Sequence, residues 1–339
     1  MGDISIAINI GSPLSSIKLV SDTFNSIKNN IGTERYQVLI SLGLHIPTDL
    51  RNWIRNYCHL NSRFIIFQEV EDSWASFINK AIDLSIEYKY FVKSHDDIKL
   101  LTPNLYEKLI SELERINQDV GWISFTDIGW KYGDFSPSIR PGYHIDHLYE
   151  KSWENRNIFQ FHLFPKNWTR NKNPFIHYGY KILSKTLKKD LDYPKPIKKI
   201  AKFELDMPSA SVKCHAPFNH FVVIKMEVLQ KIGKCEDWGT KNALLVDEDW
   251  GLRASMIGVP NIWIPDIEYF HHRGNKEGGN TRSISEIKKN EILIHKMFRN
   301  KWGFSSLPSK EELKYIVKQH KNNFISWSID KRSYEWDYI

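Results

Sequence analysis

The stretch Lys93-Ser94-His95-Asp96-Asp97-Ile98 decides the fold, and it follows the apolar run Tyr88–Val92. An apolar run that ends in a histidine and two carboxylates is typical of a buried strand that carries a ligand site at its carboxyl end. Open α/β sheets bind ligands at that edge, and clustered carboxylates can hold a divalent cation there. Residues two apart on a strand face the same side, so His95 and Asp97 are predicted to lie together, with Asp96 turned away.

Two later clusters carry the same kind of chemistry. The first is the acidic segment Val246-Asp247-Glu248-Asp249-Trp250, and the second is the histidine pair His271-His272, which ends a strand-like run. Carboxylates and imidazoles are common ligands of divalent cations. Taken with the first stretch, they indicate a metal-assisted transferase.

The first half of the chain alternates strand-like and helix-like patterns, which predicts a mainly parallel sheet flanked by helices. Proline at the first helical position and serine at the N-cap indicate where helices begin. The predicted strands are Ile4–Ile10, Gln37–Leu42, Arg63–Gln68, Tyr90–Lys93 and Val120–Phe125, and the predicted helices are Ser16–Asn29, Ser73–Tyr88 and one opened by Thr102-Pro103.

The second half loses its regular pattern and then regains it. No clean period runs from Ile128 to Phe203, and long irregular segments in enzymes often contact substrate. Capping boxes at Ser283 and Ser309 then predict two C-terminal helices. The other predicted elements are a strand Ala216–Lys225, a helix Glu227–Ile232 closed by Gly233, a helix Asp249–Ile257 and a strand Asn261–Ile264.

These patterns divide the chain into four parts. Residues 1–127 carry the first regular alternation, 128–205 an irregular insertion, 206–282 a second regular part, and 283–339 a helical extension. This division is the predicted domain organisation.

Composition limits the function classes. The chain has 339 residues, 41% of them apolar, a net charge of +7 and three cysteines without metal-ligand spacing. It shows neither a signal peptide nor an apolar run of membrane-spanning length, so we expect a cytoplasmic protein. The positive charge would attract a phosphorylated substrate, nucleic acid or an anionic membrane. Basic C-terminal helices would allow peripheral contact with the inner face of the membrane.

Several common motifs are missing. The segment Gly11–Lys18 differs from a phosphate-binding loop, because serine replaces its second glycine and the lysine is displaced. The chain also lacks the signatures of dinucleotide-binding, zincin and serine-hydrolase sites and of known nucleic-acid-binding modules. No nucleic-acid partner is therefore expected.

The order of motifs resembles the GT-A glycosyltransferases of the family-2 type. The resemblance runs from Ile4 to Gly303, and no single motif carries it alone. Its motifs are Ser73-Trp74-Ala75-x-x-x-Asn79, His95-Asp96-Asp97, Ala216-Pro217-Phe218-Asn219, Glu248-Asp249, a late histidine and Lys301-Trp302-Gly303.

The resemblance implies a Rossmann-like GT-A sheet and a metal-dependent glycosyltransferase. It also implies that residues 1–127 form the nucleotide-sugar-binding half of the domain, 128–205 substrate loops, and 206–282 the acceptor-binding and catalytic half. Such an enzyme moves a sugar from a nucleotide-diphosphate donor, here guessed to be a UDP-sugar, to a carbohydrate hydroxyl. A lipid-linked or surface-polysaccharide acceptor is expected. The donor leaves as a diphosphate, and Mn²⁺ or Mg²⁺ held by carboxylates would neutralise the charge that develops on it.

The resemblance also implies roles for the clustered residues. Asp97 matches the last position of the family's D-x-D motif and is the first predicted metal ligand. His95 stands where the family has its first aspartate and is expected to contact the metal or the donor ribose. One of His271 and His272 is expected to complete the metal site, since strand neighbours face opposite ways. Asp249, with Glu248, is the expected catalytic pair; Asp249 would act as general base and invert the anomeric centre.

Donor and acceptor contacts are expected on both sides of the metal. Most tryptophans in proteins simply pack, so packing is the alternative for the two named here. The expected donor contacts are Asn9, Gly11, Ser12, Asn79, His95, Asp96 and Arg273, and the expected acceptor contacts are Trp238, Trp250 and Asn219.

Two alternatives stay open at this point. A nucleotidyltransferase would use a similar sheet and similar acidic metal sites. A carbohydrate- or nucleic-acid-binding protein would use only the basic, aromatic-rich middle of the chain, without catalysis.

Overall fold

The computed structural model describes most of the predicted sheet and the helices around it. The described residues are 2–70, 73–127, 139–140, 212–214, 216–217, 220–238, 245–272 and 284–302. The second predicted C-terminal helix, with its capping box at Ser309, lies outside these residues, as does nearly all of the segment 128–205.

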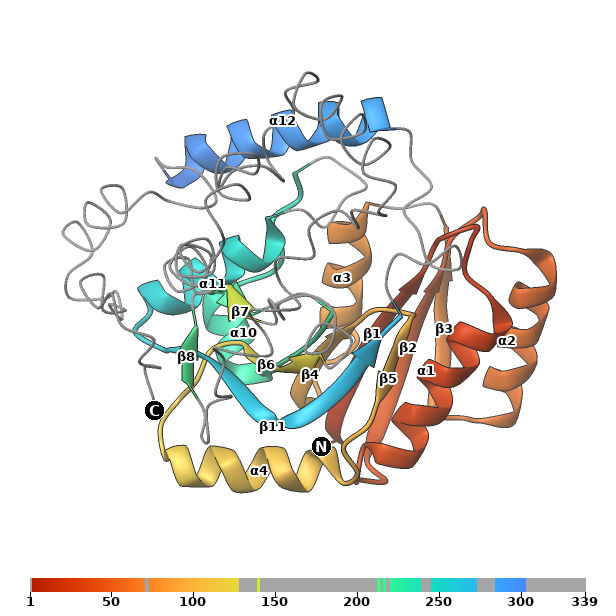
Figure 1. Cartoon of the computed structure of the whole chain (residues 1–339), viewed down its shortest axis with the longest axis horizontal. Coiled ribbons are helices and arrows are strands. Elements are labelled where there is room, and N and C mark those ends of the chain that lie inside the picture. The colour runs from red at the N-terminus through yellow and green to blue at the C-terminus, as the bar shows by residue number, and fades with distance from the viewer. Residues whose placement is uncertain are drawn as a thin grey trace, which may run out of the picture.

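One large sheet organises the molecule (Figure 1). Among the described residues its strand order is β3-β2-β1-β4-β10-β6-β11-β5, and β8 pairs separately with β11. β1, β2, β3 and β4 run parallel, whereas β10 runs antiparallel to β4 and β6. The strands are β1 Gly2–Ile10, β2 Tyr36–Leu42, β3 Phe64–Glu69, β4 Tyr88–Ser94, β5 Ile98–Leu100, β6 Ile123–Asp127, β8 Val212–Cys214, β10 Phe221–Lys225 and β11 Asn261–His271.

Helices cover both faces of this sheet. A small separate ladder pairs β7 (Ile139–Arg140) with β9 (Ala216–Pro217). The helices are α1 Ile17–Asn30, α2 Thr48–Leu60, α3 Trp74–Asp83, α4 Leu105–Ile116, α10 Met226–Ile232, α11 Val246–Met256 and α12 Ile284–Trp302.

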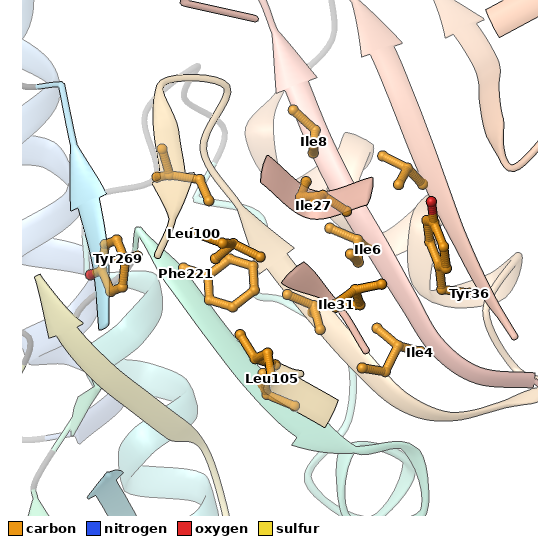
Figure 2. Packing of buried hydrophobic residues seen from close by; sticks show 14 of the residues in the cluster. Ile4, Ile6, Ile8, Ile27, Ile31, Tyr36, Leu100, Leu105, Phe221 and Tyr269 are labelled. Atoms are coloured by element: carbon orange, nitrogen blue, oxygen red, sulfur yellow. The ribbon is translucent and has the colours of Figure 1, made fainter. Parts of the chain in front are cut away.

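Two apolar cores lie on opposite faces of the sheet. Ile4, Ile6 and Ile8 of β1 pack with residues of α1, α2 and α4, and Figure 2 shows them beside Ile27 and Ile31. Ala7 of β1 belongs instead to the second core, which contains residues of α3, α10, α11 and α12. Side chains of a strand alternate between faces, so a central strand with helices on both sides is buried along most of its length, as β1 is.

Local signals explain where several helices begin and end. The Ser16 hydroxyl accepts a hydrogen bond from the amide of Leu19 and caps α1, and Ser73 caps α3 in the same way. α10 ends at Gly233, whose φ of 82° lies in the left-handed region that favours glycine.

The structure confirms the predicted fold class, an α/β fold with a mixed, mostly parallel sheet. Several boundaries differ. α2 occupies a segment for which only a turn at Pro47 was predicted, and α4 begins at Leu105, after the turn that contains Thr102-Pro103. The predicted strand Ala216–Lys225 is two short strands, and the helix expected over Ser73–Tyr88 ends at Asp83.

No helix within the described ranges combines the length and the apolar character that crossing a membrane requires.

Candidate metal centre

The residues after β4 begin the candidate site. β4 lies between parallel β1 and antiparallel β10, so its carboxyl end meets the start of β10. The backbone amide of His95 donates to the carbonyl of His220, at 2.8 Å, and Thr23 on α1 donates to the carbonyls of Asp96 and Ile98. Hydrogen bonds from two other elements therefore fix this loop.

Three histidines meet beside Asp97. Within the described residues, the candidate ligand atoms of His95, His220 and His271 all lie within 4.8 Å of one another. The rings of His220 and His271 have centroids 3.9 Å apart, and Nε2 of His271 is 3.0 Å from Oδ1 of Asp97. Nδ1 of His95 is 3.9 Å from the same oxygen. The end of β4, the start of β10 and the end of β11 thus supply one cluster.

Asp97 is an acidic residue that lies beside His95 and His271. Its side chain is 14% exposed, and its buried Oδ1 receives no hydrogen bond of acceptable geometry, although Nε2 of His271 is close. Burial alone would raise the pKa of Asp97, but the neighbouring imidazoles of His271 and His95 outweigh burial, and the pKa is lowered. The carboxylate form, which binds cations, is therefore favoured.

Asp96 turns away from this cluster, as predicted, although residues 95–97 form the turn between β4 and β5 and are not part of a strand. Its Oδ2 accepts a hydrogen bond of 2.8 Å from the Ser15 hydroxyl, on the segment before α1. Burial, together with the adjacent Asp97 carboxylate, raises the pKa of Asp96 to about 7. Asp96 thus connects the loop of residues 95–97, after β4, to the segment that follows β1.

Only one of the two late histidines enters the cluster. His271 contacts Asp97, whereas the ring of His272 packs against Phe270, with centroids 4.8 Å apart. The amide of His272 donates to the carbonyl of Asp97, so His272 contributes through its backbone. Strand alternation predicts that one residue of the pair faces the site, and the structure identifies it as His271.

The sequence analysis missed two members of the cluster, His220 and Asp127. Asp127 ends β6 and is 1% exposed; its Oδ1 accepts from the amide of His271, and its Oδ2 lies 3.8 Å and 3.9 Å from Nδ1 of His220 and His271. The sequence carries a weak signal for both residues, because each stands at the end of a strand-like run. This signal points to the cluster only when β10 is known to run antiparallel beside β4.

The expected donor contacts Asn9, Gly11 and Ser12 lie at the carboxyl end of β1. There the amide of Gly43 donates to the carbonyl of Ile10, and a Cβ on Gly43 would lie 2.8 Å from the Cα of Gly11. Glycine at position 43 permits this close approach. The segments that follow β1 and β2 therefore run side by side here. The segment after β1 continues to Ser15, which contacts Asp96.

Asn79 has a structural partner in the fold. Its side chain donates to the carbonyl of Cys235 at 2.9 Å and accepts from the amide of the same residue at 2.8 Å. This reciprocal pair joins α3 to the segment after α10. These contacts do not support the expected role of Asn79 in donor binding.

Asp249 lies in a buried ionic network. It is 1% exposed, and its partners among the described residues are Arg253, Lys301 and Trp302. Nε of Arg253 donates to Oδ2 at 2.8 Å, Nε1 of Trp302 donates to Oδ1 at 2.9 Å, and Nζ of Lys301 is 2.8 Å from Oδ1. Both oxygens are engaged, so these contacts support an anchor between α11 and α12 rather than the expected general base.

The two expected acceptor tryptophans are buried. Trp250 is 1% exposed and packs on Trp122 with centroids 4.7 Å apart, and its Nε1 donates to the carbonyl of Gly233. Trp238 packs near Phe298 of α12. Neither ring offers a face to a sugar, so the packing alternative accounts for both.

Three other expected site residues are not placed. Arg273 and Asn219 lie outside the described residues. Glu248 belongs to the first turn of α11, but its side chain is outside the described part of the structure.

Comparisons with known proteins place the fold. No protein-family model and no curated protein sequence matches the chain. GalNAc-T7, solved with UDP, GalNAc and Mn²⁺, matches 95% of this chain and 55% of its own, with a TM-score of 0.53 and 9% identity. The chain has the GT-A fold. TarS 1–349 of S. aureus, in complex with UDP-GlcNAc, matches this GT-A chain with a TM-score of 0.50 and 9% sequence identity. The match covers 95% of this chain and 72% of the TarS chain.

A further solved structure is the mannosyltransferase PcManGT from Pyrobaculum calidifontis, in complex with GDP-Man and Mn²⁺. It has a TM-score of 0.47 and 11% identity over 87% of this chain. This GT-A chain spans 64% of the mannosyltransferase and 55% of GalNAc-T7.

Proposed function

We propose that this GT-A domain is a metal-dependent glycosyltransferase that uses a nucleotide-sugar donor. One observation carries the proposal: His95, Asp97 and His271 converge at the carboxyl end of β4, in the edge of the sheet where α/β folds bind ligands. The bound UDP and Mn²⁺ of GalNAc-T7 and the UDP-GlcNAc of TarS support the choice of donor and cofactor class.

The side chains fit a divalent cation. Oδ1 of Asp97 is buried without a well-directed hydrogen-bond donor, which is unfavourable for a carboxylate unless a cation accompanies it. Asp97, His95 and His271 would hold the cation. It would supply neutralisation of the charge on the leaving diphosphate. His272, whose ring packs on Phe270, is not needed as a ligand.

The donor would lie along the ends of β1 and β2. Asn9, Gly11 and Ser12 line this edge, and Asp96 contacts the same segment through Ser15. Arg273 follows the histidine pair in the sequence and, as a guanidinium, would pair with diphosphate oxygens. A uridine nucleotide is our working choice for the donor base.

The contacts of Asp249 favour a general base outside its network. Asp247 and Glu248 stand in the first turn of the same helix, and we assign proton removal from the acceptor hydroxyl to one of these two carboxylates. A single displacement with such a base inverts the anomeric centre. The acceptor would be a carbohydrate hydroxyl, as in polysaccharide assembly.

A binding experiment tests the donor and metal parts of this proposal. Nucleoside diphosphates and nucleotide sugars are added to the protein with Mn²⁺, Mg²⁺ or chelator, and the melting temperature is followed. One diphosphate should stabilise the protein only with metal present. Asp97→Asn should abolish that shift. Asp266→Asn, an exposed position on β11, serves as the matched control and should retain it.

Two outcomes contradict the proposal. A diphosphate shift that persists with chelator and in Asp97→Asn would remove the metal role. Release of pyrophosphate from a nucleoside triphosphate would identify a nucleotidyltransferase instead.

A further inference from the structure

His220 is a histidine of the cluster that the donor-binding chemistry does not require. It precedes β10, is 7% exposed, and its ring lies on that of His271 at 3.9 Å and near that of His95 at 4.9 Å. Its carbonyl accepts the amide of His95, so the two residues are fixed against each other through the backbone. A third imidazole is thus held within reach of the position that His95, Asp97 and His271 surround.

The set of ligand atoms determines which cations the site prefers. Mg²⁺ binds almost entirely through oxygen atoms, whereas imidazole nitrogen suits first-row transition metals such as Zn²⁺, Co²⁺ and Fe²⁺. The candidate ligand atoms of the three imidazoles lie within 4.8 Å of one another, and Oδ1 of Asp97 is 3.0 Å from Nε2 of His271. Three imidazoles and one carboxylate form a nitrogen-rich set. The chemistry of this set favours a transition metal over Mg²⁺.

Asp127 lies behind two of these imidazoles. It is 1% exposed, and Oδ2 is 3.8 Å from Nδ1 of His220 and 3.9 Å from Nδ1 of His271. Metal-bound histidines commonly direct their second ring nitrogen to a carboxylate, which orients the ring and increases its basicity. At 3.8 Å and 3.9 Å these contacts are longer than hydrogen bonds, so Asp127 adds negative charge beside the two rings.

We propose that His220 is a metal ligand together with His95, Asp97 and His271, and that this three-histidine centre selects a transition metal over Mg²⁺. The proposal rests on the metal site of the proposed function and adds to it a ligand and a metal class.

Metal affinity, measured without any sugar donor, tests this proposal. The chelator-treated protein is titrated calorimetrically with Zn²⁺, Co²⁺, Mn²⁺ and Mg²⁺, and Co²⁺ is also followed by its visible absorption. The wild-type protein should bind Zn²⁺ and Co²⁺ at least 100-fold more tightly than Mg²⁺. His220→Phe keeps an aromatic ring but no ligand atom, and should weaken Zn²⁺ and Co²⁺ binding at least 10-fold.

Control variants separate this inference from the proposed function. His272→Phe makes the same change outside the cluster and should alter affinity less than about twofold, while His271→Phe should lose binding. Wild-type affinity in His220→Phe, with loss in His271→Phe, overturns the role of His220 and leaves the proposed metal site intact. Absence of metal binding by the wild-type protein overturns both.

A measurement on the unmodified protein covers the case in which His220→Phe does not fold. X-ray absorption of the Zn²⁺-loaded wild-type protein counts coordinated imidazoles through their multiple-scattering signal. Three imidazoles support the proposal, and two or fewer refute it.

Discussion

The contacts of Asp249 predict a stability defect in Asp249→Asn. The carboxylate is 1% exposed and pairs with Arg253 and Lys301, whose side chains are 18% and 31% exposed. Removing one member of a buried ion pair costs roughly 3–5 kcal/mol. The two cations can regain some hydration, and asparagine keeps one acceptor oxygen for the indole of Trp302. We therefore expect a loss of about 3 kcal/mol in the free energy of unfolding.

Urea unfolding measures this loss. Tryptophan fluorescence follows the transition, and circular dichroism in buffer checks that the variant is folded. Asp266→Asn, an exposed aspartate on β11, is the matched control and should change the free energy of unfolding by less than about 0.5 kcal/mol.

One result would refute the reasoning about Asp249. If Asp249→Asn unfolds at the urea concentration of the wild-type protein, the ionic network does not stabilise the contact between α11 and α12. If that stable variant also transfers no sugar, Asp249 regains the role of general base. A destabilised variant, with turnover lost instead in Asp247→Asn or Glu248→Gln, supports the assignment given above.

Three further predictions concern stability. Asn79→Ala removes both hydrogen bonds to the backbone of Cys235 and should cost about 2 kcal/mol in urea unfolding, while equal stability would show that the pair contributes nothing. Arg55 and Arg51 hold the pKa of Glu69 below its ordinary value of 4.5. The stability that the charged Glu69 carboxylate adds through these arginines is therefore complete above about pH 4.5 and is lost as pH falls through the folded pKa. In Glu69→Gln the melting temperature should therefore fall less steeply with decreasing pH below about pH 4.5. Adding Zn²⁺ or Mn²⁺ at 100 times its dissociation constant should raise the melting temperature by roughly 4 °C, and chelator should reverse the rise; an unchanged melting temperature would argue against metal binding by the folded state.

Sequence patterns predicted the sheet well, because burial repeats along a strand. The alternating isoleucines of β1, the largely apolar run of β2 and the serine caps of α1 and α3 are local signals, and they identified the elements within a few residues. α2 was missed although Leu50 and Ile54 are its buried positions four residues apart. Its N-cap is Pro47, which has no side-chain capping bond and was interpreted as a turn.

The site was predicted only where its geometry is local. The entry of one residue of the His271-His272 pair follows from strand alternation at the end of β11. His95 and Asp97 lie close together as predicted, but in the turn between β4 and β5 and not on a strand. His220 could not be placed, because it enters through β10, whose antiparallel position beside β4 depends on long-range pairing. Asp249 was given a chemical role because acidic residues at a helix start suit both catalysis and ionic anchoring, and only the positions of Lys301 and Trp302 distinguish these uses.

The separation of the histidines along the chain has a consequence for folding. His95, His220 and His271 come from three strands that become neighbours only when β10 and β11 have docked beside β4 and β6. An unfolded chain holds these imidazoles far apart and has little affinity for a cation as a group. Metal binding should therefore follow assembly of the sheet. In refolding experiments, the visible absorption of bound Co²⁺ would then show when β4, β10, β6 and β11 have paired.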